Sequence, residues 1–253
     1  MGQLREKVWI WGHPENSLKG HYGLVKDSNV TPIDGMKYLG ARNIFYVPMS
    51  RPCNKDEKSI GLQENCISFG WSKEIIDDID DIIERKKKFD SFNILIYDDF
   101  FQTDNEGNNA FCINKEKLLA NKKKLNDNGL EMWVVFYERD KDIDISEYLD
   151  CFDGISFWFW NQPSEEQYQE TIKMFIAKTP NKKRLVGCYL YDFGREKECD
   201  ADRVEAELEN NKKLLQEGLI EGFILHTNVV GDMGFEAYER CAKWMQKNGD
   251  IEI

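Results

Sequence analysis

Eight short stretches of this chain have the pattern of β-strands, and most are continuous apolar runs. Such a run is typical of a parallel strand with both faces buried, whereas a half-exposed antiparallel strand alternates apolar and polar residues. The chain is therefore expected to build a parallel sheet. The expected strands are 8–13, 43–48, 66–71, 93–98, 132–138, 154–160, 185–192 and 222–227, of which 66–71 has the weakest pattern.

The segments between these strands carry helix signals. Thr31 offers an N-cap hydroxyl and is followed by a proline at the first helical position, which predicts a helix to about Gly40. In 72–89, isoleucines at spacings of three and four form one apolar stripe, with acids early and lysines late. Further helices are expected over 114–128, 164–177, 201–217 and 235–247, while 145–149 is too short and 50–65 is expected to be a long loop.

Strands that alternate with helices predict a specific architecture. Eight repeats within 253 residues match the usual size of a closed (β/α)8 TIM barrel, formed as a single domain over residues 1–253. An open doubly wound sheet is the alternative. The loop after the first strand reads GHPENS and lacks the G-x-G-x-x-G turn that brings backbone amides to a pyrophosphate. No nucleotide cofactor is therefore expected.

Composition and charge narrow the possible partners. The chain is 41% hydrophobic and 13% aromatic, which suffices for a large core, and no Pro-, Gly- or Ser-rich linker divides it. A formal net charge of -12 repels phosphate groups, so neither nucleic acid nor an anionic membrane surface is an expected partner.

Cysteine and histidine spacing argues against a metal site. The seven cysteines form no C-x-x-C pair, and the three histidines form neither H-x-H nor H-E-x-x-H. An odd number of single cysteines suggests a reducing compartment, and the amino terminus resembles neither a signal peptide nor a membrane span. A cytoplasmic location is expected, and a secreted protein with its signal peptide trimmed would have the same sequence.

Acidic residues follow several of the expected strands. In a (β/α)8 barrel the active site is built from the carboxyl ends of the strands. The runs LIYDDFF, FYERD and YLYDFG each lead an apolar strand into an acid. Burying an ionised carboxylate without a partner costs free energy, so acids at three strand ends indicate a catalytic or binding role. Any single one of these acids could instead cap a loop or pair with an arginine. The expected catalytic residues are Asp98, Asp99, Glu138 and Asp192.

Aromatic residues at the same ends indicate a carbohydrate ligand, either a small sugar or an oligosaccharide. Sugar rings have apolar C–H faces that stack on Trp and Tyr, while their hydroxyls bond to carboxylates, amides and imidazoles. Trp158 and Trp160 share a strand face, and both line the mouth if Ser156 points into the barrel; otherwise they pack beneath helices. The expected substrate-binding residues are His13, Arg51, Trp71, Tyr137, Trp158, Trp160, Tyr191, His226 and Asn228.

Four segments, WGHPENS, YDDFF, YLYDFG and GFILHTN, resemble bacterial glycoside-hydrolase-like (β/α)8 proteins, and the resemblance spans nearly the whole chain. It implies an acid/base carboxylate after the fourth strand and a second carboxylate after the seventh. Here these positions hold Asp98 or Asp99 and then Asp192. The large retaining clan has glutamates at both places, so this chain departs from the pattern.

Glycoside hydrolysis needs one carboxylic acid to protonate the leaving oxygen and one carboxylate to stabilise or attack the anomeric carbon. We expect Asp99 as the general acid, Asp192 or Glu138 as its partner, and Asp98 orienting Asp99 or binding a hydroxyl. Because strand residues alternate sides, only one of the adjacent aspartates can point squarely into the mouth. Two alternatives stay open: a carbohydrate-binding barrel without hydrolytic activity, and a divalent-metal sugar isomerase or lyase with the four acids as ligands.

Overall fold

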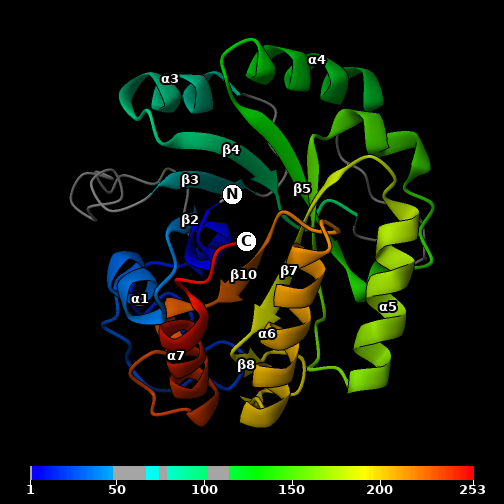
Figure 1. Cartoon of the computed structure of the whole chain (residues 1–253). Helices are drawn as coiled ribbons and strands as arrows, with labels where there is room; N and C mark the ends of the chain where they lie inside the picture. Colours follow the sequence, from blue (N-terminus) through cyan, green and yellow to red (C-terminus); the bar gives the residue numbers. More distant parts are fainter. Residues whose placement is uncertain (1, 48–66, 74–78, 102–113) are drawn as a thin grey trace.

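The computed structural model describes residues 2–47, 67–73, 79–101 and 114–253 (Figure 1). Eight parallel strands close into a barrel, so the expected (β/α)8 fold is confirmed. The first strand pairs with the last, which rules out the open doubly wound sheet. In barrel order the strands are β1 (Val8–Gly12), β10 (Gly222–His226), β7 (Lys183–Tyr189), β6 (Gly154–Trp158), β5 (Glu131–Tyr137), β4 (Phe92–Tyr97), β3 (Ser68–Lys73) and β2 (Asn43–Tyr46).

Helices surround the barrel, as Figure 1 shows. The N-cap expected at Thr31 is present, and the side chains of Thr31, Asn114, Ser164 and Asp200 each accept a hydrogen bond from an amide in the first helical turn. The helices are α1 (Pro32–Leu39), α3 (Asp80–Lys88), α4 (Lys115–Asn126), α5 (Glu165–Lys178), α6 (Ala201–Gln216) and α7 (Glu236–Asn248), with 3-10 turns η1 (Leu4–Lys7), η2 (Glu138–Asp140), η3 (Ser146–Cys151) and η4 (Asn228–Val230).

Most element boundaries differ from expectation by one or two residues, and two differences change the element to which residues belong. Ser72 and Lys73 belong to β3, where the ladder with β4 overrides the helical pattern, and α3 begins only at Asp80. The seventh strand ends at Tyr189, and the next residues form β8 (Tyr191–Asp192), which pairs antiparallel with β9 (Lys197–Glu198). The expected loop over 50–65 lies outside the described residues.

Large aromatic side chains fill the barrel. Trp9 stacks on Phe45 with ring centroids 4.4 Å apart, and Trp11 contacts Trp158 edge-on at 5.4 Å. Gly187 makes room for this packing, because a Cβ there would lie 2.0 Å from the Trp158 ring. The interior is therefore a packed core, and ligand chemistry is confined to the ends of the strands.

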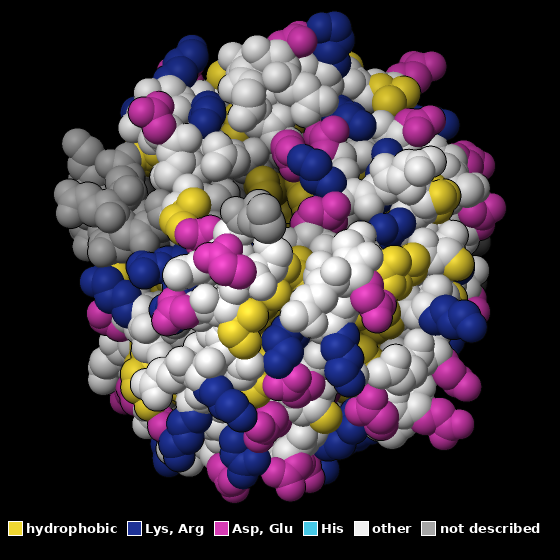
Figure 2. All heavy atoms as spheres, in the orientation of Figure 1, with side chains coloured by type: hydrophobic (Ala, Val, Ile, Leu, Met, Phe, Trp, Pro, Cys, Tyr) yellow, Lys and Arg dark blue, Asp and Glu magenta, His cyan; other side chains and the backbone are white. Residues whose placement is uncertain are grey.

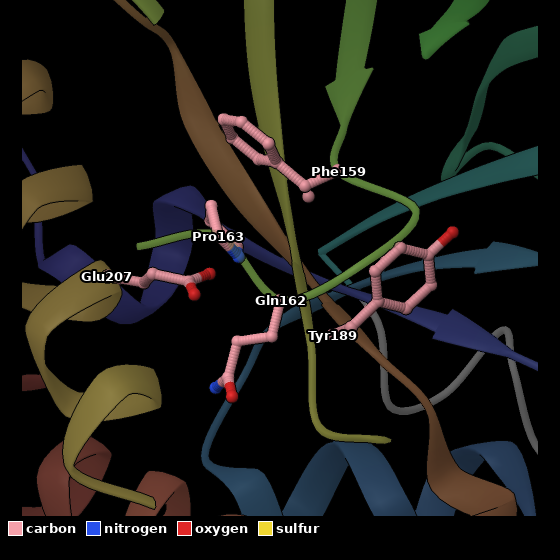
Figure 3. Close-up of a pocket in the computed structure, with 6 residues that line it drawn as sticks. Phe159, Gln162, Pro163, Tyr189 and Glu207 are labelled. Atoms are coloured by element: carbon pink, nitrogen blue, oxygen red, sulfur yellow. The ribbon is translucent and has the colours of Figure 1, made fainter. Parts of the chain in front are cut away.

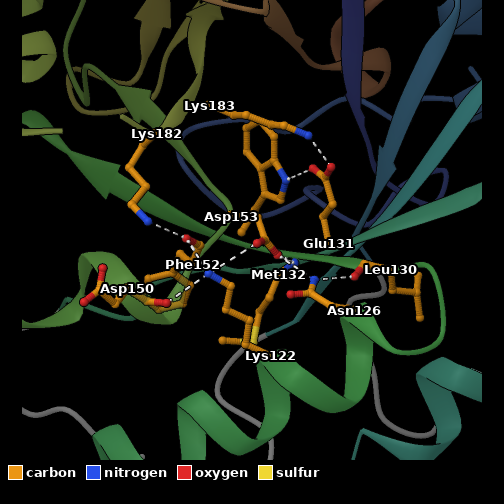
Figure 4. A network of polar contacts seen from close by, with 11 residues as sticks. Lys122, Asn126, Leu130, Glu131, Met132, Asp150, Phe152, Asp153, Lys182 and Lys183 are labelled. Atoms are coloured by element: carbon orange, nitrogen blue, oxygen red, sulfur yellow. Dashed lines mark hydrogen bonds and ion pairs between the residues drawn. The ribbon is translucent and has the colours of Figure 1, made fainter. Parts of the chain in front are cut away.

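A polar network closes the amino-terminal end of the barrel (Figure 4). The Asp153 carboxylate accepts hydrogen bonds from the Met132 amide and from Asn126 Nδ2, both at 2.9 Å. Lys122 pairs with Asp153 at 3.3 Å and donates to the Phe152 carbonyl. These contacts fasten α4 to the amino-terminal ends of β5 and β6.

The surface carries both signs of charge. Figure 2 shows Lys and Arg side chains interspersed with Asp and Glu over one face. Within the described ranges, no helix is long and apolar enough to cross a membrane.

Candidate active site

Asp98 and Tyr137 meet at the carboxyl-terminal rim, where β4 and β5 run side by side. The Tyr137 hydroxyl donates to Asp98 Oδ1 at 2.9 Å, and the Asp99 amide donates to the same oxygen at 2.9 Å. Burial and the Asp99 charge raise the pKa of Asp98, the hydrogen bond from Tyr137 and the Arg139 charge oppose them, and the resulting pKa is about 7. A carboxyl group with this pKa can exchange a proton at neutral pH.

Asp99 takes a different environment from its neighbour. Its backbone lies in the left-handed region at φ 52°, which is uncommon for a residue other than glycine. Its Oδ1 accepts from Arg139 Nη2 at 3.2 Å, and the two side chains are 40% and 43% exposed. Of the adjacent aspartates, both of which are partly buried, Asp98 reaches the next strand and Asp99 stays in a solvated ion pair.

Aromatic rings gather beside this carboxylate pair. Trp160 contacts Tyr22, Tyr137 and Tyr189 nearly perpendicularly, with ring centroids 5.8, 6.3 and 6.3 Å away. The Arg139 guanidinium lies 4.5 Å from the Tyr137 centroid and 5.2 Å from that of Trp160. Trp160 is partly exposed and Tyr22 is exposed, so these rings present apolar surface to solvent.

His13 and His226 lie together, as expected for residues that follow β1 and end β10. Their Nε2 atoms are 3.3 Å apart, so one ring donates to the other. Burial lowers the pKa of His13 to about 3 and that of His226 well below its ordinary value, so both rings are neutral at pH 7. The His226 ring packs 4.9 Å from Tyr189, beneath the aromatic group. Neither Nδ1 has a partner among the described residues.

Asp192, the expected second carboxylate, is 1% exposed and engaged in the β8–β9 hairpin. It accepts from the Arg195 amide at 3.0 Å, from Arg195 Nη1 at 2.8 Å and from the Gln162 amide at 3.2 Å. Both oxygens thus have structural partners, which favours a role in fixing the hairpin over one in chemistry.

Asn228 and Tyr191 also serve the scaffold. The Asn228 amide accepts from the His13 N–H at 2.8 Å and donates to the His13 carbonyl at 2.9 Å and to that of Val30 at 2.7 Å. The Tyr191 hydroxyl donates to the Tyr22 carbonyl at 2.9 Å. Both side chains hold the long loop after β1 against the rim.

The two remaining tryptophans differ in position. Trp71 does not reach the rim: it is 1% exposed beneath α3, with the Arg85 guanidinium 4.2 Å from its ring. Successive residues of a strand point to opposite sides. Because the preceding Gly70 faces Phe45 inside the barrel, Trp71 points outward. Trp158 does point inward with Ser156, to which its Nε1 donates at 3.0 Å, but it is buried below the mouth.

Two further candidates complete the expected set. Glu138 follows β5, is partly exposed and pairs with Lys141 at 2.9 Å. Arg51 lies outside the described residues.

Four rim residues were not in the expected set. Arg139 follows a predicted strand and Tyr189 lies near the end of another. Position at a strand end, the criterion used for the expected residues, could therefore have included both. Asp140, whose pKa burial raises to about 6, follows β5 in the same way. Tyr22 lies in the loop between β1 and α1, where no periodicity indicates which residues return to the rim.

A narrow pocket lies behind the rim, between β7 and α6 (Figure 3). It leaves essentially no room for a water molecule. Burial raises the pKa of Glu207, which lines it, to about 8, so the side chain is protonated at neutral pH. In Figure 3 the Tyr189 hydroxyl points away from Glu207, so this carboxyl group is separate from the rim.

The part of the chain that the structure describes contains no group of three or more His, Cys, Asp or Glu side chains able to hold a metal ion. The metal-dependent isomerase or lyase therefore has no ligand set there.

No model of a protein family matches the sequence, and no curated protein matches it. Solved structures match over the whole fold. A mutant tryptophan synthase α-subunit from Pyrococcus furiosus has a TM-score of 0.55 at 10% identity, covering 99% of this chain and 100% of that one. A tryptophan synthase structure from M. tuberculosis has a TM-score of 0.51 at 8% identity, covering 99% and 94%. At such identities the likeness shows the barrel fold alone. Neither neighbour is a glycosidase, so the activity implied by the sequence resemblance gains no support from them.

Proposed function

We propose that the rim binds a carbohydrate and that Asp98 is the general acid in cleavage of a glycosidic bond. The observation that carries this proposal is the position of Asp98: a partly buried carboxyl group with a pKa of about 7, hydrogen-bonded to Tyr137 beside a group of aromatic rings. A general acid works best when its pKa lies near the working pH, and burial is how enzymes raise a carboxyl pKa to that range.

This assignment exchanges the roles expected for the two aspartates. Asp98 becomes the proton donor, and the partner carboxylate comes from Asp99 or Glu138, which are partly exposed at the same rim. Their ion pairs are solvated, and such pairs contribute about 0–1 kcal/mol, so a substrate can displace either cation at small cost. Asp192 is set aside because its oxygens are already engaged.

The test is hydrolysis of a panel of aryl glycosides by the protein and by Asp98→Asn. The turnover rate of the variant should be lower by at least about 100-fold, the usual contribution of a general acid. Asp127→Asn is the matched control, since Asp127 pairs with Lys123 on exposed α4 surface. Full activity in Asp98→Asn would overturn the assignment.

A carbohydrate-binding barrel without hydrolytic activity is the second candidate. The engagement of Asp192 favours it, because the carboxylate expected after the seventh strand is not free to act. Sugar binding without turnover of any aryl glycoside in the panel would select this candidate.

A further inference from the structure

Arg139 is held in a defined position and is still open to solvent. Its guanidinium lies in the corner formed by the Tyr137 and Trp160 rings, which meet at 83°. The side chain is nevertheless 43% exposed. Rings on two sides reduce the freedom of the guanidinium, so it is oriented before a ligand arrives.

The polar contacts of Arg139 are incomplete. Within the described ranges, only Nη2 has a hydrogen-bond partner, a single Asp99 oxygen at 3.2 Å. A guanidinium can form two parallel hydrogen bonds with one carboxylate, and this pair forms only one of them. Because the contact is long and exposed, it contributes little and can be exchanged for a better one.

We propose that Arg139 binds the carboxylate of an acidic sugar, so that the rim selects glycosides of uronic acids. This inference rests on the proposed function and names its substrate class. The sugar ring would lie against the exposed aromatic surface of Trp160 and Tyr22, and its carboxylate would replace Asp99 on the guanidinium.

The position of Arg139 also couples charge recognition to the acid. The Arg139 charge lowers the pKa of Asp98, whereas burial and Asp99 raise it. A substrate carboxylate on Arg139 would offset that positive charge and help Asp98 keep its proton. A neutral sugar would leave the charge of Arg139 in place.

The experiment is calorimetric titration at pH 6 with glucuronic acid, galacturonic acid, glucose, galactose and glucose 6-phosphate. In the unmodified protein each uronic acid should bind at least tenfold more tightly than its neutral counterpart. Arg139→Met should remove this preference, so that each uronic acid binds no more than about twofold more tightly than its neutral counterpart. Arg42→Met is the matched control, because Arg42 is exposed just before β2, at the amino-terminal end of the barrel.

The outcomes separate this inference from the proposed function. Equal affinity for acidic and neutral sugars, or a preference for the phosphate ester, would overturn the carboxylate site and leave carbohydrate binding standing. An unchanged preference for the acids in Arg139→Met would overturn the role of Arg139 alone. Failure of all five compounds to bind would overturn the inference, while the aryl glycoside assay tests hydrolysis separately.

Discussion

The Tyr137 hydroxyl and Asp98 Oδ1, 2.9 Å apart, join the ends of two neighbouring strands through one hydrogen bond. This bond stabilises the ionised form of Asp98 and so opposes the effect of burial.

Tyr137→Phe should therefore raise the pKa of Asp98 above its value of about 7, since the ionised carboxylate loses a donor. The carboxyl carbon signal of Asp98, followed by NMR during a pH titration, measures the change. Tyr38→Phe is the matched control, because it removes a tyrosine–carboxylate bond to Glu239 on the exposed helical surface. A lower pKa for Asp98 in Tyr137→Phe would contradict the assigned direction.

Asp192→Asn should reduce stability and leave the chemistry of the rim largely intact. The substitution weakens a buried charge-assisted contact with Arg195, which typically costs about 1–3 kcal/mol. Urea unfolding measures the loss, and the turnover rate on the best glycoside of the panel should change by no more than a few-fold. A turnover rate that falls as far as in Asp98→Asn, with unchanged stability, would return Asp192 to the catalytic group.

The two buried histidines and Glu207 should make opposite contributions to the pH dependence of stability. The buried histidines have lowered pKa values and bind more protons when unfolded, so their contribution to stability is lost as pH falls below 6.5, their ordinary value. Glu207 has a pKa raised from 4.5 to about 8, so the folded chain binds more protons and stability falls as pH rises through that window.

Glu207→Gln tests whether Glu207 causes the loss of stability as pH rises. The amide cannot ionise, so the variant should lose less stability than the parent between pH 5 and pH 8, by about a few kcal/mol. Urea midpoints measured across that range provide the comparison. Parallel curves for the parent and the variant would exclude Glu207 as the source.

Gly187→Ala should destabilise the barrel, because the added methyl group would lie 2.0 Å from the Trp158 ring. Overpacking of a filled core costs about 1–3 kcal/mol. Thermal unfolding measures the loss. The double variant with Trp158→Phe should recover part of it, since the smaller ring leaves space for the methyl group. Two losses that simply add would show that the two sites do not compete for space.

The fold could be predicted from the sequence because parallel barrel strands are buried on both faces and therefore appear as apolar runs. The expected strands are all present, and caps such as Thr31 set the start of a helix. Local sequence patterns did not predict where pairing between strands overrides helix propensity. Ser72 continues β3 through its ladder with β4, and the β8–β9 hairpin depends on side-chain contacts of Asp192.

The site was predictable only in part. Asp98, Tyr137 and Trp160 were predicted as site residues because each lies at the end of an expected strand. In the structure, Tyr137 contacts both of the others. The side of a strand on which Trp71 falls depends on register, which single-sequence patterns do not give. The engagement of Asp192 depends on Arg195, in a hairpin that the sequence did not reveal.

The Asn228 side-chain amide is hydrogen-bonded to the backbone N–H and carbonyl of His13, so it joins the two ends of the chain. His13 lies near the beginning of the chain, and His226, whose ring it contacts, is 213 residues further along. The pairing of the first and last strands that closes the barrel also brings these two rings together. A chain in which β10 has not docked on β1 therefore has neither a closed barrel nor a complete rim, because both depend on contacts between the two ends of the sequence.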